Sequence, residues 1–213
     1  MPLNPFLYPK AKHRRKLKPS SYSSYVRYKP SLKQEFSSQC VYCCLPDGVK
    51  GEDNFGVDHY RPKSKFPELE TVYTNLFYAC NCCNRRKGSF WPTEEQQKAG
   101  EFIPNPCDHL MFDHLRYRSA YVHARSAAGR LTERVLMLND EESLSYREFV
   151  LRTIVALEEK QRRLHETIRR IDQLCAMNPE RADQLNAEKA KSETSLMELQ
   201  KDLRRLTGGN TPI

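Results

Sequence analysis

Two pairs of cysteines constrain the fold of this chain more than any other feature. Cys40-Val-Tyr-Cys43 and Cys80-Asn-Cys-Cys83 are CxxC pairs, and 36 residues separate them. Each tight turn can present two thiolates to one ion, and two such pairs complete a closed, tetrahedral zinc site. We therefore expect Cys40, Cys43, Cys80 and Cys83 to hold a structural Zn²⁺. The neighbouring Cys44 and Cys82 leave alternative registers open.

The rest of the sequence favours a reducing compartment for these thiols. No apolar run approaches the roughly 20 residues that a membrane span needs. The first ten residues, MPLNPFLYPK, contain prolines where a signal peptide would need an uninterrupted apolar stretch. Clustered cysteines in a reducing compartment bind metal more often than they form disulfides. We expect a cytoplasmic protein without membrane contact.

Basic residues gather at one end of the chain. The net charge is +8, and residues 1–34 hold nine Lys or Arg and no acidic residue, so the remainder sums to −1. Prolines, serines and tyrosines are frequent there, and no helical or strand period is visible. We predict an extended N-terminal arm over residues 1–34, which favours contact with nucleic acid or an acidic partner.

The remaining chain divides into two regions of different pattern. Residues 35–118 hold the clustered cysteines, most aromatic residues and many turn-forming residues, which predicts a small metal-organised unit. Residues 119–207 are predicted to be a connector followed by two long antiparallel helices, because apolar residues recur at spacings of four and three. Met177-Asn178-Pro179 marks the break between the helices. Residues 208–213 are predicted to be a tail.

Polar residues between the cysteine pairs suggest chemistry that the zinc site itself cannot perform. Asp58-His59 lies in a strand-like run, Asn75 in a second β-rich run, and Asn84 directly after Cys83, where a short helix can open. This order predicts strand, turn, strand and helix. A carboxylate, an imidazole and an amide could then converge on one place.

These residues resemble the motif of the HNH endonuclease family, which has the ββα-metal fold. The resemblance covers Cys40 to Trp91 and rests on Asp58-His59, Asn75 and Asn84 between the cysteine pairs. One departure is that Asn84 stands where the family name implies a histidine, and asparagine still offers an oxygen ligand. The fold class implied is α+β: a zinc-stabilised ββα-metal unit followed by a helical hairpin.

The resemblance implies a role for each residue. His59 would accept a proton from the attacking water, and Asn75 would hold His59 in register. Asp58 and Asn84 would bind one catalytic Mg²⁺, Mn²⁺ or similar divalent ion through oxygen atoms. A set of basic side chains would contact phosphates: Arg61, Lys63, Arg85, Arg86 and Lys87.

A narrower resemblance is to the HNH subunits of Septu-type antiphage systems, also found with some retrons. It rests on VDHYRPKS, on NLFYACNCCNRRKG and on the later FIPNPCDH. It implies a bacterial defence nuclease acting on nucleic acid, with double-stranded DNA as the expected substrate, and an ABC/SMC-like ATPase partner at the helical hairpin. Two alternatives stay open: a non-catalytic zinc module that binds nucleic acid or protein, and a standalone restriction-type HNH nuclease.

Overall fold

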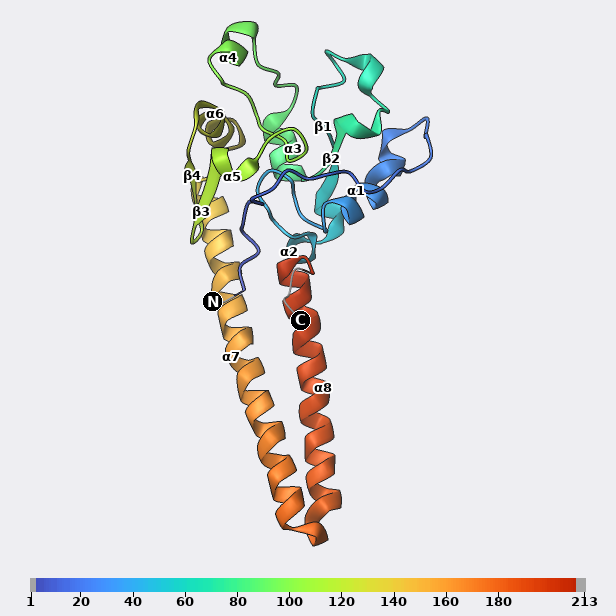
Figure 1. Ribbon diagram of the computed structural model, residues 1–213, viewed down its shortest axis with the longest axis vertical. Coiled ribbons are helices and arrows are strands. Elements are labelled where there is room, and N and C mark those ends of the chain that lie inside the picture. Colours follow the sequence, from blue (N-terminus) through green and yellow to red (C-terminus); the bar gives the residue numbers. More distant parts are fainter. Residues whose placement is uncertain (1–2, 210–213) are drawn as a thin grey trace.

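The computed structural model describes residues 3–209. A long helical hairpin projects from a unit of mixed helices and short strands (Figure 1), so the α+β class predicted from the sequence is confirmed. The strands are β1 Phe55–His59, β2 Leu76–Cys80, β3 Leu115–Arg118 and β4 Tyr121–Ala124. The helices are α1 Lys29–Glu35, α2 Asp47–Lys50, α3 Asn81–Lys87, α4 Glu94–Lys98, α5 Met111–His114, α6 Ala127–Leu136, α7 Glu141–Met177 and α8 Ala182–Thr207.

The centre of the mixed unit is the strand–strand–helix order that the sequence predicted. β1 and β2 pair antiparallel, with Asp58 opposite Phe77 and His59 opposite Leu76. All five residues of β2 are buried, which matches its continuous apolar sequence, LFYAC. α3 follows β2 without a loop, and it begins where the Cys80 thiol accepts the backbone N–H of Cys83. The end of β1 lies beside the second half of α3, because Asn84 donates to the backbone oxygen of Val57 and Lys87 to that of His59.

Residues 3–24 of the predicted N-terminal arm pack against the mixed unit, whereas residues 25–34, which were also predicted to be extended, form a 3₁₀ turn (Tyr25–Tyr28) and most of α1. Residues 3–24 contain no helix or strand, and Phe6 and Tyr8 are buried in the core. Glu35 anchors the segment by accepting the backbone N–H groups of Lys16 and Leu17 at 2.8 and 2.9 Å. Those contacts are long-range, so composition alone gave no sign of them. The first two residues of the predicted arm lie outside the described range.

The predicted connector has more structure than expected. β3 and β4 form a second antiparallel hairpin, and α6 begins at Ala127. Each strand is four residues long, too short for the alternation of buried and exposed residues to stand out in the sequence. Residues 119–130 are thus part of the folded unit, since Ala120, Val122 and Ala128 are buried.

The helical hairpin is close to its predicted form. α7 ends at Met177, a 3₁₀ turn covers Pro179–Arg181, and α8 runs antiparallel to α7 (Figure 1). Thirty-seven residues in α7 correspond to a length of about 55 Å. None of the helices within residues 3–209 combines the length and apolar character that a membrane span requires. The predicted tail lies outside the described residues from residue 210 onward.

The base of the hairpin belongs to the core of the mixed unit. Val150 and Ile154 of α7 and Leu199 and Leu203 of α8 are buried in the same apolar cluster as β2. The end of α8 comes so close to α2 that a Cβ on Gly48 would lie 2.5 Å from the backbone oxygen of Arg205. The two regions therefore share one core near the base, and only the distal part of the hairpin is free of the mixed unit.

Candidate active site

The two CxxC pairs meet in one buried cluster. The Sγ atoms of Cys40, Cys43, Cys80 and Cys83 all lie within 4.8 Å of one another, and all four residues are buried. The Cys43 and Cys80 sulfurs are 3.8 Å apart. Four thiolates at the usual Zn–S length of about 2.3 Å stand about 3.8 Å apart at the corners of a tetrahedron. The cluster therefore has the dimensions of a tetrathiolate zinc site.

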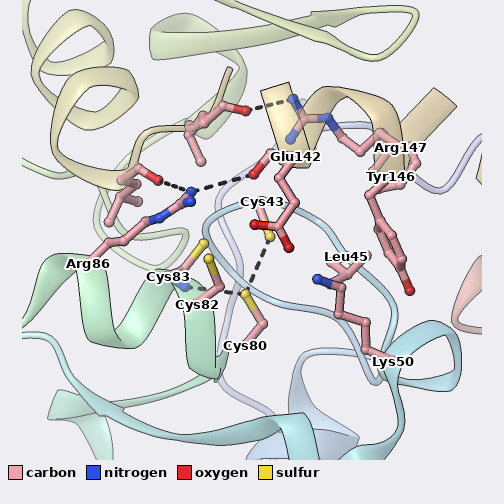
Figure 2. Close-up of a pocket in the computed structure, with 14 residues that line it drawn as sticks. Cys43, Leu45, Lys50, Cys80, Cys82, Cys83, Arg86, Glu142, Tyr146 and Arg147 are labelled. Atoms are coloured by element: carbon pink, nitrogen blue, oxygen red, sulfur yellow. Dashed lines mark hydrogen bonds between the residues drawn. The ribbon is translucent and has the colours of Figure 1, made fainter. Parts of the chain in front are cut away.

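The two cysteines that left the register open lie outside this cluster. Cys44 is buried, and its thiol points toward the backbone oxygen of Leu7 at 3.6 Å. Cys82 is half-buried and lines a cavity between the cluster and the start of α7 (Figure 2). The geometry thus favours the register that uses the first and last cysteine of each pair.

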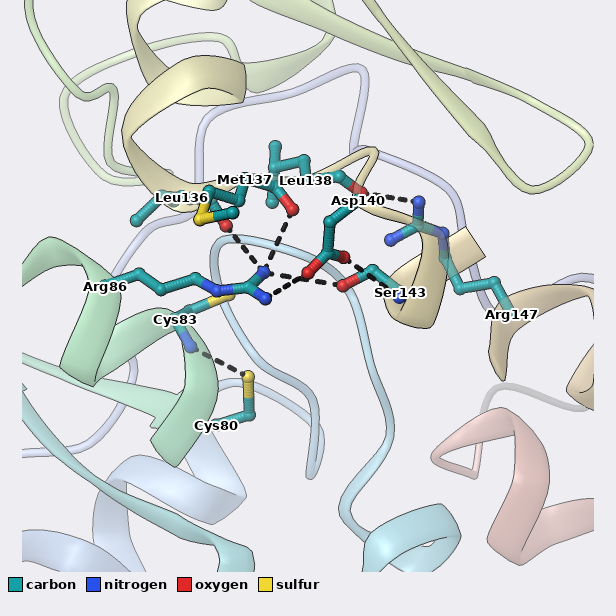
Figure 3. A network of polar contacts seen from close by, with 9 residues as sticks. All are labelled: Cys80, Cys83, Arg86, Leu136, Met137, Leu138, Asp140, Ser143 and Arg147. Atoms are coloured by element: carbon teal, nitrogen blue, oxygen red, sulfur yellow. Dashed lines mark hydrogen bonds and ion pairs between the residues drawn. The ribbon is translucent and has the colours of Figure 1, made fainter. Parts of the chain in front are cut away.

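Arg86 closes the same cavity from the side of α3. Its guanidinium donates to the backbone oxygens of Leu136 and Met137 at 3.0 and 2.9 Å, and it forms an ion pair with Asp140 (Figure 3). Asp140 also caps α7 by accepting the backbone N–H of Ser143. Arg86 therefore joins the helix that carries Cys83 to the start of the helical hairpin.

His59 stands at the end of β1 in a single tautomer. Its Nε2 lies 2.9 Å from the backbone oxygen of Glu70, and a carbonyl oxygen can only accept, so Nε2 carries the proton. Nδ1 is then the nitrogen that can accept a proton. The Tyr25 ring packs edge-on against the imidazole at 4.6 Å. Desolvation lowers the pKa of His59 below its usual value, which favours the neutral, proton-accepting form near pH 7.

Asp58 precedes His59 and is almost fully buried. Its Oδ2 accepts the Tyr42 hydroxyl at 2.6 Å, and its Oδ1 accepts the Lys87 ammonium at 3.0 Å. Burial raises the pKa of Tyr42 well above its usual value, so the hydroxyl keeps its proton and remains a donor. A carboxylate has about four lone-pair positions, and two of those on Asp58 remain for another ligand.

Asn84 shares a surface pocket with Asp58 and His59. Pro62, Lys63, Ser64, Gly88 and Ser89 complete its lining. The Asn84 Nδ2 donates to the backbone oxygen of Val57 at 3.3 Å, which fixes the amide and leaves Oδ1 as the atom available to a cation. Carboxylate and amide oxygens are the ligands that Mg²⁺ prefers. The side chains that line the pocket therefore suit a divalent cation next to a neutral imidazole.

Asn75 supports the loop that follows His59 instead of contacting the imidazole. Its Oδ1 accepts the backbone N–H of Arg61, and its Nδ2 donates to the backbone oxygens of Arg61 and Leu69. Leu69 directly precedes Glu70, whose carbonyl orients His59. Asn75 thus braces both sides of the loop on which the orientation of His59 depends.

The five basic residues expected to contact phosphates fall into two groups. Arg61, Lys63 and Arg85 are exposed, and Lys63 lines the pocket with His59 while it forms a solvent-exposed ion pair with Glu70 at 3.0 Å. Arg86 is held by Asp140, and Lys87 is buried against Asp58 and the backbone oxygen of His59. Arg86 and Lys87 thus have partners inside the protein, which differs from the expectation of phosphate contact. Their positions three or four residues after Cys83 place them on the inner face of α3, a signal that was present in the sequence.

Tyr42 is the site residue that the sequence analysis missed. It lies between Cys40 and Cys43 and reads there as a spacer in a CxxC turn. Tyr42 and Asp58 are 16 residues apart in the sequence, and no local sequence pattern predicts a contact over that separation.

Comparison with known proteins gives two matches. Residues 40–90 match the model of the HNH endonuclease family. The Septu protein PtuB of Bacillus thuringiensis is 29% identical over 126 residues, which are 59% of this chain and 46% of that protein. This chain therefore aligns with less than half of the length of that relative. No solved structure matches the chain. The chain thus carries an HNH endonuclease domain and is a distant homologue of the Septu protein PtuB.

Proposed function

We propose that this protein is a metal-dependent endonuclease that hydrolyses phosphodiester bonds of double-stranded DNA. The observation that carries the proposal is the pocket shared by Asp58, His59 and Asn84, built on the β1–β2–α3 unit that matches the HNH family. A module that only binds nucleic acid needs no carboxylate, oriented imidazole and fixed amide in one pocket.

The roles of the residues follow from their contacts. Nδ1 of His59 accepts the proton of the attacking water, while the Glu70 carbonyl holds Nε2–H and keeps the ring in that orientation. Asp58 and Asn84 hold one Mg²⁺ or Mn²⁺ ion through oxygen atoms. When bound, that ion stabilises negative charge on the scissile phosphate and the leaving oxygen. Asn75 maintains the loop that carries the Glu70 carbonyl.

The four clustered cysteines have a different task in this proposal. Cys40, Cys43, Cys80 and Cys83 hold one structural Zn²⁺, which stabilises the turn before β1 and the junction between β2 and α3. All four ligand positions are taken by thiolates, so this ion offers no place to substrate.

Exposed cations around the pocket would bind the DNA backbone. Arg61, Lys63 and Arg85 lie in or next to segments that line the pocket, and contacts of this kind position a duplex without reading its sequence. The N-terminal segment adds six further exposed basic residues: Lys10, Lys12, Arg14, Lys16, Lys18 and Arg27. Binding should therefore weaken steeply as salt is raised.

The biological role that we propose is that of the effector nuclease in a bacterial antiphage complex with an ATPase. The homology to a Septu protein supports the defence role. Exposed apolar side chains near the tip of the hairpin support a protein partner there: Leu174 and Met177. They are 38% and 77% exposed and lie three residues apart, on neighbouring turns at the end of α7.

Nicking of a supercoiled plasmid tests the nuclease assignment. We expect the parent protein to cut in Mg²⁺ or Mn²⁺, alone or with its ATPase. The cleavage rate of His59→Ala should be at least on the order of a hundredfold lower. His165→Ala is the matched control, because His165 is exposed on α7 far along the chain from the pocket. Equal cutting by His59→Ala and the parent would refute the assignment.

A shortened hairpin tests the proposed partner. Replacing residues 161–192 by a short Gly-Ser linker removes the distal part and keeps Val150, Ile154, Leu199 and Leu203 in the core. We expect this variant to stay folded but to lose the ATPase that co-purifies with the full-length protein from cells expressing both. Equal recovery of the ATPase by the two proteins would show that the distal hairpin is not the contact.

A further inference from the structure

The carboxylate of Asp58 has an unusual connection to the cysteine cluster. Tyr42 lies within the first CxxC turn and is fully buried, and its hydroxyl donates to Asp58 at 2.6 Å. The same turn is held from outside, because the Tyr8 hydroxyl donates to the Tyr42 backbone oxygen at 2.7 Å and the Tyr117 hydroxyl to that of Cys43 at 2.8 Å. The donor that faces Asp58 therefore sits in a rigid segment.

The second cysteine pair reaches the same carboxylate by another route. Lys87 ends α3, the helix that carries Cys83 and Asn84, and its ammonium lies 3.0 Å from Asp58 Oδ1 and 2.6 Å from the His59 backbone oxygen. The Lys87 and Asp58 side chains are 1% and 2% exposed. A buried carboxylate without such partners would be strongly destabilising. Each oxygen of Asp58 thus has one donor, and each donor comes from one cysteine-bearing segment.

We propose that Tyr42 and Lys87 are positioning residues that aim the Asp58 carboxylate at the divalent cation. The two cysteine pairs then determine the geometry of the cation site as well as the fold. This inference rests on the proposed function, since it takes Asp58 as a ligand of that cation. Groups that hydrogen-bond a metal ligand commonly change metal affinity by about 10- to 100-fold when removed.

Tyr42 and Lys87 should have opposite effects on the affinity for the divalent cation. The Tyr42 hydroxyl is neutral, so it orients Asp58 without repelling a cation. The Lys87 ammonium is a positive charge that orients the same carboxylate and also opposes a second cation beside it. Removal of the hydroxyl should therefore weaken cation binding, and neutralisation of the ammonium should strengthen it.

The first test compares two buried tyrosines that have the same kind of partners. In Tyr42→Phe we expect Mn²⁺ affinity, measured by titration calorimetry on the full chain, to fall about tenfold while zinc content and helicity stay at the parental level. Tyr78→Phe is the control, because Tyr78 is also fully buried, donates to Asp47 at 2.8 Å, and shares Asp47 with a lysine, Lys33. Its Mn²⁺ affinity should not change.

Asp58→Asn separates failure of this inference from failure of the proposed function. If Asp58→Asn loses Mn²⁺ binding while folded Tyr42→Phe binds Mn²⁺ as tightly as the parent, the positioning role is wrong and the proposed cation site stands. If the parent and Asp58→Asn bind Mn²⁺ equally, or neither binds it, the proposed cation site is wrong.

Lys87→Gln supplies a second variant that does not depend on Tyr42. Glutamine keeps a hydrogen-bond donor within reach of Asp58 but removes the charge. We expect Mn²⁺ to bind several-fold more tightly and to raise the melting temperature more than it does in the parent protein. Unchanged or weaker Mn²⁺ binding in folded Lys87→Gln would overturn the role assigned to the ammonium.

Discussion

The cysteine cluster and the His59 pocket share helix α3, which supplies Cys83 to the first and Asn84 to the second, yet they differ in burial and in the groups that they offer. The cluster is buried and offers four thiolates of one kind. The pocket is open to solvent and offers a carboxylate, an imidazole and an amide. A closed site with a complete set of ligands stabilises a fold, and an open site with mixed groups can accept water and a phosphate. The difference supports our proposal that the first site is structural and the second catalytic.

Loss of the cluster should have the largest effect. A structural zinc supplies on the order of 10 kcal/mol of folding free energy in small zinc domains, and whole domains are stable by only about 5–15 kcal/mol. We expect Cys83→Ser to lose zinc and to unfold the mixed unit, measured by metal analysis and circular dichroism. Cys82→Ser is the control and should keep about one zinc per chain, because Cys82 lies outside the cluster. A folded, zinc-free Cys83→Ser protein would remove the structural role.

Changes of pH should act on the pocket and leave the cluster intact. His59 must be neutral to accept a proton, and desolvation lowers its pKa. The value of kcat/KM should therefore rise with pH through an apparent pKa below the usual histidine value, and it should be level near pH 7. Initial rates of plasmid nicking from pH 5 to 8, with zinc content checked at each pH, measure this. A rise centred above the usual histidine value would mean that another group is the base.

Asn84 should affect the divalent cation without affecting the zinc. In Asn84→Ala the cation loses one oxygen ligand, so we expect a higher Mg²⁺ requirement for cleavage and partial rescue at high Mn²⁺. Asn81→Ala is the control, since Asn81 is exposed at the start of the same helix. The zinc content of both variants should equal that of the parent. An unchanged Mg²⁺ requirement in Asn84→Ala would exclude Asn84 as a ligand.

Substitutions of the adjacent residues Arg85 and Arg86 should have the smallest effects. One should change DNA binding and the other the stability of the protein. Arg85 is exposed beside Asn84, whereas Arg86 is tied to Asp140 and the start of α7. Arg85→Gln should weaken DNA binding several-fold and lower the salt slope by about one unit, without a change in melting temperature. Arg86→Gln should lower the free energy of unfolding by about 2 kcal/mol. It should change the salt dependence of DNA binding little. If the two variants exchanged these effects, the division between the cluster side and the pocket side of α3 would be wrong.

Much of this arrangement could be predicted because its signals are local. The cysteine spacing, the Asp58-His59 pair, the asparagine after Cys83 and the break at Asn178-Pro179 each lie within a few residues, and they predicted the strand–strand–helix order and the helical hairpin.

Features that depend on distant contacts were missed. Lys87 and Arg86 look like exposed cations until β1 and α7 pack against them. The N-terminal segment looks like a free arm until Glu35 binds its backbone. In the sequence Tyr42 only separates two cysteines, whereas in the structure its hydroxyl donates to Asp58. In each case the partner is many residues away and the sequence does not identify it, although the spacing of Arg86 and Lys87 from Cys83 indicates the inner face of α3.

The division between a closed structural site and an open catalytic site can be tested in one experiment. The purified protein is dialysed against EDTA, its zinc is quantified, and plasmid nicking is then measured with no added ion, with Mg²⁺ and with Zn²⁺. We predict that about one zinc per chain remains, that nicking is absent without added ion, and that Mg²⁺ alone restores it. Nicking that persists without added ion, or that returns only with Zn²⁺, would contradict the account.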